Sequence, residues 1–373
     1  MDALMLPLNW QRVRLGDIGK PCMCKRVMKH QTTRYGEIPF YKIGTFGNTA
    51  DAFISKKLFL EYKTKYSFPK KGDILISASG TIGRAVIYDG KPAYFQDSNI
   101  VWIDNDETLV KNDFLFYAYS NVKWNTEHTT ILRLYNDNFR NTLIPLPPLN
   151  EQIAIANILS ALDRYLYALD ALILKKEGVK KALSFELLSQ RKRLKGFNQA
   201  WQRVRLGDIA NYLISNLSAE QITQQGKIKV YDVNNFIGYT DTTFISDKPY
   251  ISIVKDGSVG RVRILPPKTN ILSTMGALIA NHRTTTEFLF YLLSNFDFKN
   301  FTSGSIIPHI YFKDYKEKTI FLPPLNEQSA IANILSALDN EIISLKNKKR
   351  QFENIKKALN HDLMSAKIRV LKK

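Results

Sequence analysis

The sequence predicts an α+β protein with two mixed α/β domains, separated by two long antiparallel helices that form a coiled coil. Three observations predict this pseudo-twofold internal repeat. The string WQRVRLGDI occurs at 10–18 and again at 201–209. The string LPPLNEQIAIANILSALD at 146–163 returns at 322–339 with one difference. The stretches between these strings resemble each other only faintly. Such self-similarity decides the architecture before any single residue does.

The composition allows real cores and indicates an anionic partner. Of 373 residues, 45% are hydrophobic and 12% aromatic. At about 150 residues per domain, this length favours two or three domains. Lys and Arg number 53 against 34 Asp and Glu, which gives a net charge of +19. A polyanion such as nucleic acid is the partner that this surplus suggests.

The chain reads as a cytoplasmic protein without a membrane segment. The first ten residues lack the basic and apolar regions of a signal peptide, and no run of about 18 apolar residues is present. Cys22 and Cys24 are the only cysteines. They are too close for an ordinary disulfide bridge and have no second pair for zinc, so reduced thiols are expected.

The two repeated segments read as long helices. Asn150 and Asn326 are N-cap candidates followed by an acid, and apolar residues then recur every three or four positions. A helix over 151–190 would be roughly 60 Å long, too long for the core of one small domain. We expect a heptad seam between the two helices. Its central residues are Leu162, Leu169, Leu172, Leu338, Leu345 and Phe352.

Charge predicts the direction of pairing. Each helix is acidic first and basic later: 151–174 carries net −2 and 175–195 net +6, while 326–345 carries −3 and 346–373 carries +8. Only antiparallel helices place each acidic half beside a basic one. Lys176 and Lys348 occupy seam positions, where they fix the register or loosen the coil. The alternative is that each helix packs on its own domain.

The diverged stretches read as short strands with one helix each. Strands are expected at 73–78, 85–88 and 99–103, which are β-branched and bounded by Gly, Asp and Asn. A helical period is found at 109–119 and at 286–293.

Two loops recur in both stretches. SGTIGR at 79–84 corresponds to DGSVGR at 256–261 in the second copy, and a polar turn at 129–133 corresponds to 303–309. Paired glycines with a hydroxyl and an arginine suit close approach to a phosphate or a base edge. The alternative is a tight glycine turn between two strands. QDSN at 96–99 has only a weak counterpart near Thr269 and Asn270.

These strings carry a family resemblance. LGDI after a tryptophan, PFYKIG at Pro39, SGTIGR, and above all the twice-used LPPLNEQxAIANILSALD resemble the specificity subunit of type I restriction-modification systems, the HsdS family. The resemblance covers essentially the whole chain. It implies target recognition domains at 1–145 and 201–321, and conserved helical spacers at 146–200 and 322–373.

The resemblance also implies partners. Each recognition domain would read one half of an interrupted double-stranded DNA site, and different domains imply an asymmetric site. The helices would dock two methyltransferase subunits, and restriction (motor) subunits can join them. S-adenosylmethionine, ATP and magnesium would be used by those partners, and this chain would bind no cofactor itself.

Predicted DNA contacts lie in the recurring loops. Arg84 and Arg261 are the leading candidates, because arginine can meet guanine or phosphate with two hydrogen bonds. The full set is Lys42, Thr45, Ser79, Thr81, Arg84 and Arg133 in the first domain, and Lys255, Ser258, Arg261, Arg263, Ser303, Ser305 and His309 in the second.

Catalytic signals are missing from the sequence. It has no Asn-Pro-Pro-Tyr or Asp-Pro-Pro-Tyr string for base methylation, no nucleotide-binding G-x-x-x-x-G-K-[ST] loop and no metal-ligand spacing of histidines. We therefore expect a non-enzyme without a metal. Two alternatives remain open, a non-specific or architectural DNA-binding protein and a structural adaptor. Most of the surplus charge lies in the two basic helix halves, so specificity is expected from a few loop residues.

Overall fold

The computed structural model describes residues 7–128 and 132–370. The chain divides into two compact units, one formed by Met1–Leu169 with Lys348–Lys373 and the other by Asp170–Asn347. Each unit combines one α/β domain with part of each long helix. The four consecutive segments expected from the sequence are therefore distributed over two compact bodies, and the helices belong to both.

The first domain is built on two small sheets. The larger is antiparallel in the order β2-β8-β5-β6, and the smaller has the order β4-β3-β7, with β3 and β7 parallel. All four side chains of β5 are buried, and three of them are Ile or Leu, which suits a central strand. The strands are β2 (Gly19–Met23), β8 (Ile100–Asn105), β5 (Ile74–Ser77), β6 (Ala85–Ile87), β4 (Phe53–Ile54), β3 (Ile38–Tyr41) and β7 (Tyr94–Phe95).

The second domain repeats this topology strand for strand. Its sheets have the orders β13-β19-β16-β17 and β15-β14-β18, and β14 again pairs in parallel with β18. The two domains therefore share one fold despite their faint sequence similarity. These strands are β13 (Ala210–Ile214), β19 (Met275–Ala280), β16 (Tyr250–Val254), β17 (Val262–Leu265), β15 (Phe236–Thr240), β14 (Ile228–Tyr231) and β18 (Asn270–Ile271).

Short helices complete each domain. The predicted helical segments form α3 (Asn112–Tyr119) and α6 (Thr286–Ser294), whose apolar residues enter the core beside the central sheet. The first domain also has α2 (Lys56–Lys65) after β4, whereas the second has no helix at the corresponding place. Other short α-helices are α1 (Leu15–Ile18), α4 (Asn136–Asn141) and α7 (Phe312–Tyr315).

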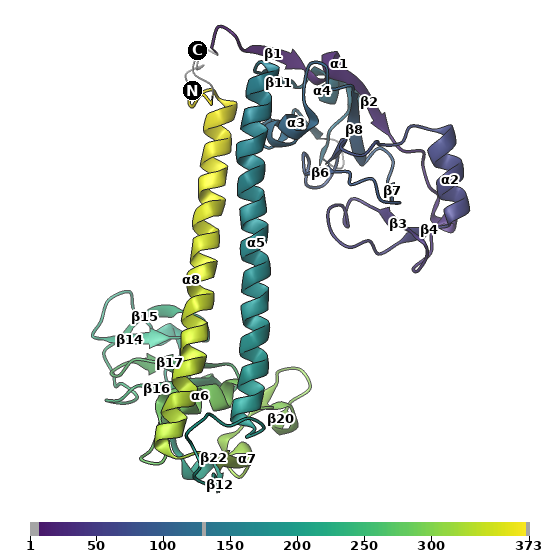
Figure 1. Ribbon diagram of the computed structural model, residues 1–373. Coiled ribbons are helices and arrows are strands. Elements are labelled where there is room, and N and C mark those ends of the chain that lie inside the picture. Colours follow the sequence, from purple (N-terminus) through teal and green to yellow (C-terminus); the bar gives the residue numbers. More distant parts are fainter. Residues whose placement is uncertain (1–6, 129–131, 371–373) are drawn as a thin grey trace. The chain divides into compact units, whose positions relative to one another are not determined.

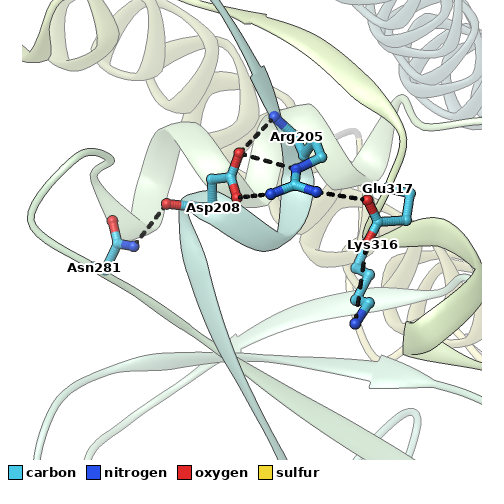
Figure 2. A network of polar contacts seen from close by, with 5 residues as sticks. All are labelled: Arg205, Asp208, Asn281, Lys316 and Glu317. Carbon is cyan, nitrogen blue, oxygen red and sulfur yellow. Dashed lines mark hydrogen bonds and ion pairs between the residues drawn. The ribbon is translucent and has the colours of Figure 1, made fainter.

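In each domain the repeated WQRVRLGD string contributes a strand that pairs with the last strand of that domain in chain order. β1 (Gln11–Arg14) pairs with β11 (Leu143–Leu146), and β12 (Gln202–Arg205) with β22 (Thr319–Leu322). In the second domain Figure 2 shows Arg205 between the carboxylates of Asp208 and Glu317, at 3.3 and 3.0 Å.

This exposed network holds the turn after β12. Asn281 Nδ2 also donates to the backbone oxygen of Asp208 over 3.0 Å. The hydrogen bond from the backbone N–H of Arg205, followed by that from its side chain, lowers the pKa of Asp208. In the first domain the uncharged Asn141 stands at the position of Glu317, so this position offers no carboxylate for a matching ion pair.

The two long helices are α5 (Leu149–Leu188) and α8 (Leu325–Met364), shown in Figure 1. In the first unit Tyr165 of α5 packs against Phe352 of α8, with ring centroids 4.7 Å apart. In the second unit Lys176 lies 2.8 Å from Glu341. Residues in the first half of α5 thus contact residues in the second half of α8, and residues in the second half of α5 contact residues in the first half of α8. The antiparallel pairing predicted from the charges is confirmed.

The predicted seam needs one correction. Leu172 is 37% exposed, and the neighbouring Ile173 is buried in its place. A straight helix has 3.6 residues per turn, so a strict seven-residue pattern drifts off the contact face. Leu169 is buried and the other predicted members are half-buried, namely Leu162, Leu338, Leu345 and Phe352. The seam lysine Lys176 forms an ion pair, and Lys348 lies over the Tyr165 ring.

A buried glutamate lies at each end of the helix pair, in the first turn of one of the two helices. Glu151, in the first turn of α5, accepts from Trp10 Nε1 at 3.0 Å and from Arg369 at 2.7 and 2.9 Å. Its side chain is 2% exposed. The same arrangement recurs in the second unit, with Trp201 at 2.9 Å and Arg193 at 2.7 and 3.2 Å from Glu327. Each arginine follows the end of one helix and binds the start of the other. We call these two sites the Trp–Glu–Arg locks.

A second repeated contact ties α3 and α6 to the long helices. Asp163 accepts from Tyr117 Oη at 2.7 Å and from Lys356 Nζ at 2.5 Å. In the second unit Asp339 accepts from Tyr291 at 2.9 Å and Lys180 at 2.5 Å. Burial, followed by the hydrogen bond to Asp163, raises the pKa of Tyr117, so its hydroxyl stays protonated as the donor.

In 7–128 and 132–370, the structure has no helix both long and apolar enough to span a lipid bilayer.

Candidate nucleic-acid interface

The SGTIGR string forms a compact loop between β5 and β6. Gly83 N–H donates to the carbonyl of Ser77 at 2.9 Å, and Ser77 N–H donates to the carbonyl of Arg84 at 3.0 Å. The Ser77 hydroxyl donates to the Thr81 carbonyl. Gly80 and Gly83 both have positive φ, at 66° and 82°. The alternative interpretation, a glycine turn between two strands, thus describes its backbone correctly.

The DGSVGR string forms the same loop between β16 and β17. Gly260 N–H donates to the carbonyl of Val254 at 2.9 Å, and Val254 N–H donates to that of Arg261 at 2.9 Å. Gly257 and Gly260 have φ of 84° and 80°. Two loops with different side chains therefore share one backbone frame. We call them the first and second glycine loops.

The second glycine of each loop lies against an aromatic ring. A Cβ at Gly83 would lie 2.0 Å from Trp124 Nε1, and one at Gly260 would lie 2.6 Å from Phe298 Cδ2. Together with the positive φ, this contact excludes any side chain at these positions. The glycines are thus required by the frame, whatever the loop binds.

An asparagine from a separate loop contacts the arginine at the end of each glycine loop. Asn48 Oδ1 lies 3.5 Å from Arg84 Nη2, and Asn234 Oδ1 lies 2.7 Å from Arg261 Nη2. Both arginines are exposed. Arg263 in β17 donates to the Asn234 carbonyl at 2.9 Å and lies over the Tyr231 ring. The guanidinium groups are positioned at the surface.

A cation lies beside the first glycine loop. Ser79 and Arg133 form an antiparallel bridge, and Arg133 Nη2 donates to Ser98 Oγ at 2.9 Å and to Asn99 Oδ1 at 3.2 Å. The Ser79 hydroxyl donates to the same Asn99 oxygen at 2.8 Å. Ser98 has a positive φ of 55°, which is uncommon for serine and marks a constrained turn.

An acid and a histidine take the corresponding places in the second domain. Asp256 and His309 form the same antiparallel bridge, with His309 Nδ1 2.7 Å from Asp256 Oδ1. Ile310 N–H donates to the Lys255 carbonyl at 2.9 Å, just as Leu134 N–H donates to that of Ala78 at 2.8 Å. The bridge is retained while its side chains change from hydroxyl and guanidinium to carboxylate and imidazole.

The structure gathers the predicted first-domain residues around the first glycine loop. Lys42 and Thr45 belong to a turn in which Lys42 N–H donates to Thr45 Oγ1 at 3.1 Å. Gly47, in the same segment, lies beside the Arg84 guanidinium. Ser79 needs a correction, because it is only 8% exposed and its hydroxyl is already donated to Asn99. It supports the loop from inside, whereas Thr81 is exposed. Thr129, which began the predicted polar turn, lies outside the described residues.

The second-domain residues lie around the second glycine loop and on a neighbouring hairpin. Ser258 is exposed at the loop, and Lys255 precedes it. The hairpin is formed by β20 (Thr302–Ser303) and β21 (His309–Ile310), which brings Ser303 beside His309. Ser305 is exposed at the hairpin tip.

The counterpart of QDSN also differs from the prediction. Thr274, whose carbonyl accepts from Lys255 N–H at 3.1 Å, takes the place of Asn99, whose carbonyl accepts from Ala78 N–H at 2.8 Å. The prediction at Thr269 and Asn270 was wrong, because those residues lie before and within β18 rather than after it.

Sequence reasoning missed Asn48, Asn234, Trp124 and Phe298. Each reaches its loop from a distant part of the chain, and only the spacing within the loops themselves could be recognised in the sequence.

Among the described residues, 7–128 and 132–370, no cluster of His, Cys, Asp and Glu could hold a metal ion.

The structure is that of a two-domain α/β protein in which each domain presents a glycine loop framed by polar side chains. A model of the family described as the type I restriction modification DNA specificity domain matches residues 7–176 and 198–354. The chain therefore belongs to this family. It is a specificity subunit, the non-catalytic DNA-recognition component of a type I restriction-modification system, as the sequence resemblance predicted.

Individual relatives agree with this assignment. A Haemophilus influenzae protein named as a type I restriction enzyme specificity subunit is 62% identical over 152 residues, which span 40% of each chain. The MjaVIII specificity subunit of a type I restriction enzyme from Methanocaldococcus jannaschii is 25% identical over an alignment of 414 residues, covering 99% of this chain and 95% of that one.

A solved structure supports the fold. The S subunit of a type I restriction-modification system from M. genitalium matches with a TM-score of 0.64, covering 96% of this chain and 98% of that one. At 20% identity, this likeness concerns the fold alone.

Proposed function

We propose that the chain reads an asymmetric, two-part site in double-stranded DNA, with one half read by each domain. The observation that carries this proposal is the pair of glycine loops, which share a backbone frame and differ in the side chains beside it. Two identical readers would favour a site with two equal halves. Ser79 with Arg133 in one domain and Asp256 with His309 in the other favour two different halves.

The loop chemistry supports different base preferences. Arginine donates two hydrogen bonds to the O6 and N7 acceptors of guanine, and carboxylates accept from the N4 amino group of cytosine. Arg84 and Arg133 offer only donors to the first half-site. In the second domain, Asp256 adds an acceptor to the same glycine loop that carries Arg261.

We further propose that the helices dock two methyltransferase subunits, and restriction subunits with them, in the cytoplasm. Support comes from apolar side chains that α5 leaves in solvent, notably Tyr167 at 78% and Leu174 at 72% exposure. Exposed apolar residues on a helix favour a protein partner. S-adenosylmethionine, ATP and magnesium would be used in those subunits.

The experiment is co-expression of the chain with its cognate adenine methyltransferase, followed by genome-wide mapping of methylated adenines. The expected result is one interrupted motif with unequal halves. A chimera in which 19–145 come from another family member should change one half and leave the other intact. Methylation without any shared motif would contradict sequence recognition, and a change in both halves would contradict one domain per half.

A further inference from the structure

The hairpin beside the second glycine loop ends in two exposed isoleucines. Its tip runs from Gly304 to Pro308, between β20 and β21. Ile306 is 92% exposed and Ile307 54%. On the hairpin, Ser303 and Ser305 precede the two isoleucines and Pro308 follows them.

The tip is held firmly on the second glycine loop. The Pro308 carbonyl accepts from Gly257 N–H at 2.8 Å, and His309 contacts Asp256 at 2.7 Å. The turn is closed, because Gly304 has a φ of 90° and a Cβ there would lie 2.2 Å from the Ile307 carbonyl oxygen. Ile306 is therefore displayed by a short hairpin that is hydrogen-bonded to the candidate reading loop.

A branched apolar side chain that is exposed to water contributes no hydrophobic stabilisation until a ligand or partner buries it. Because the tip is joined to the second glycine loop, a ligand that covers the loop also meets Ile306. DNA offers an apolar surface when two stacked base pairs separate, and proteins insert Ile, Leu, Phe, Met or Pro between such steps. Ile306, Ile307 and Pro308 form a run of these residue types.

We propose that Ile306, supported by Ile307, is a wedge that inserts between two base pairs of the half-site read by the second domain. This inference rests on the proposed function. The wedge adds specificity without a hydrogen bond, because the cost of unstacking differs between base steps and is lowest at flexible pyrimidine–purine steps. The second half-site is accordingly expected to contain such a step.

The test uses the full chain and a duplex that carries the methylation-mapped site, with 2-aminopurine placed at successive positions of the second half. Binding should raise the 2-aminopurine fluorescence at one step, because unstacking relieves its quenching. The double variant Ile306→Ser, Ile307→Ser should lose this rise and bind about tenfold more weakly. Ile306→Leu should keep both the fluorescence rise and the affinity. Ile214→Ser is the matched control, because Ile214 is an isoleucine of the same domain that is 57% exposed and lies outside the glycine loop and the hairpin.

The outcomes separate the wedge from its alternatives. Wild-type binding without a fluorescence rise, or a rise that persists in the double variant, would overturn the wedge alone. Loss of affinity on replacing a thymine of the second half by uracil, with no rise, would assign Ile306 to a thymine methyl group instead. A double variant that binds DNA normally but no longer captures the methyltransferase would assign it to that protein. No wild-type binding to any duplex would overturn both the wedge and the proposed function.

Discussion

The Trp–Glu–Arg locks and the glycine loops are both duplicated, but they are duplicated differently. At the locks, geometry and chemistry recur together, with the same three residue types around Glu151 and around Glu327. At the loops, the backbone recurs while Ser79 is replaced by Asp256 and Arg133 by His309. The molecule keeps chemistry constant where its helices meet and varies it where its domains present a surface. The difference separates residues that build the protein from residues that select its ligand.

The largest expected effect tests the equivalence of the locks. Glu151→Ala and Glu327→Ala each leave an arginine without its carboxylate and a buried tryptophan N–H without an acceptor. Each should lower the free energy of unfolding by about 3–5 kcal/mol in urea denaturation. Glu341→Ala, which removes a surface ion pair with Lys176, is the control and should cost about 0.5 kcal/mol or less. A loss at only one of the two locks would show that they are not equivalent.

The next effect tests the shared frame of the loops. Gly83→Ala combines a positive φ with a contact to Trp124, a ring held by Tyr119 and Phe139. It should destabilise the first domain by about 2–4 kcal/mol and abolish recognition of one half-site. Gly44→Ala is the control, since a Cβ there meets nothing within 4 Å. Circular dichroism during urea denaturation and methylation mapping measure the two effects, and an unchanged first half-site would contradict this account of the frame.

A smaller effect distinguishes the two half-sites. Arg84→Ala should weaken DNA binding by about 1–3 kcal/mol, with a penalty confined to one half-site if the guanidinium reads a base. Arg261→Ala should do the same for the other half. Competition binding with duplexes altered in one half at a time measures this. An equal loss for all sequences would assign the arginine to phosphate, and no loss would remove it from the interface.

The smallest effect concerns the helix contacts of α3 and α6. Tyr117→Phe and Tyr291→Phe each remove one hydrogen bond to an aspartate that keeps its lysine partner. Each should cost about 1 kcal/mol of unfolding free energy. Tyr167→Phe, on an exposed side chain, should cost nothing measurable. Equal values for all three variants would mean that the aspartate bonds contribute little.

Much of the fold could be predicted because patterns in the amino-acid sequence indicate it directly. The repeat gave the architecture, the helices begin at Leu149 and Leu325 within two residues of the expected start, and charge polarity gave their direction. The seam was less predictable. Leu172 and Ile173 are both apolar, and the choice between them depends on how far the helix turns before it meets its partner.

The candidate site could be predicted only in part. The glycine loops were readable because both glycines and the arginine lie within six residues. The Asn48 contact to Arg84 and the burial of Ser79 were not readable, since both depend on which distant segments the two sheets bring together. Pairing at long range has no signature in the spacing of a single loop.

The frame of the glycine loops has a consequence for protein engineering. The packing of Gly83 on Trp124, and of Gly260 on Phe298, determines the loop backbone. Thr81 and Ser258 are exposed and carry no such constraint. A variant library that randomises these two positions while preserving the glycines and their rings should therefore yield mostly folded proteins. Selection from it could alter one half of the recognised sequence at a time.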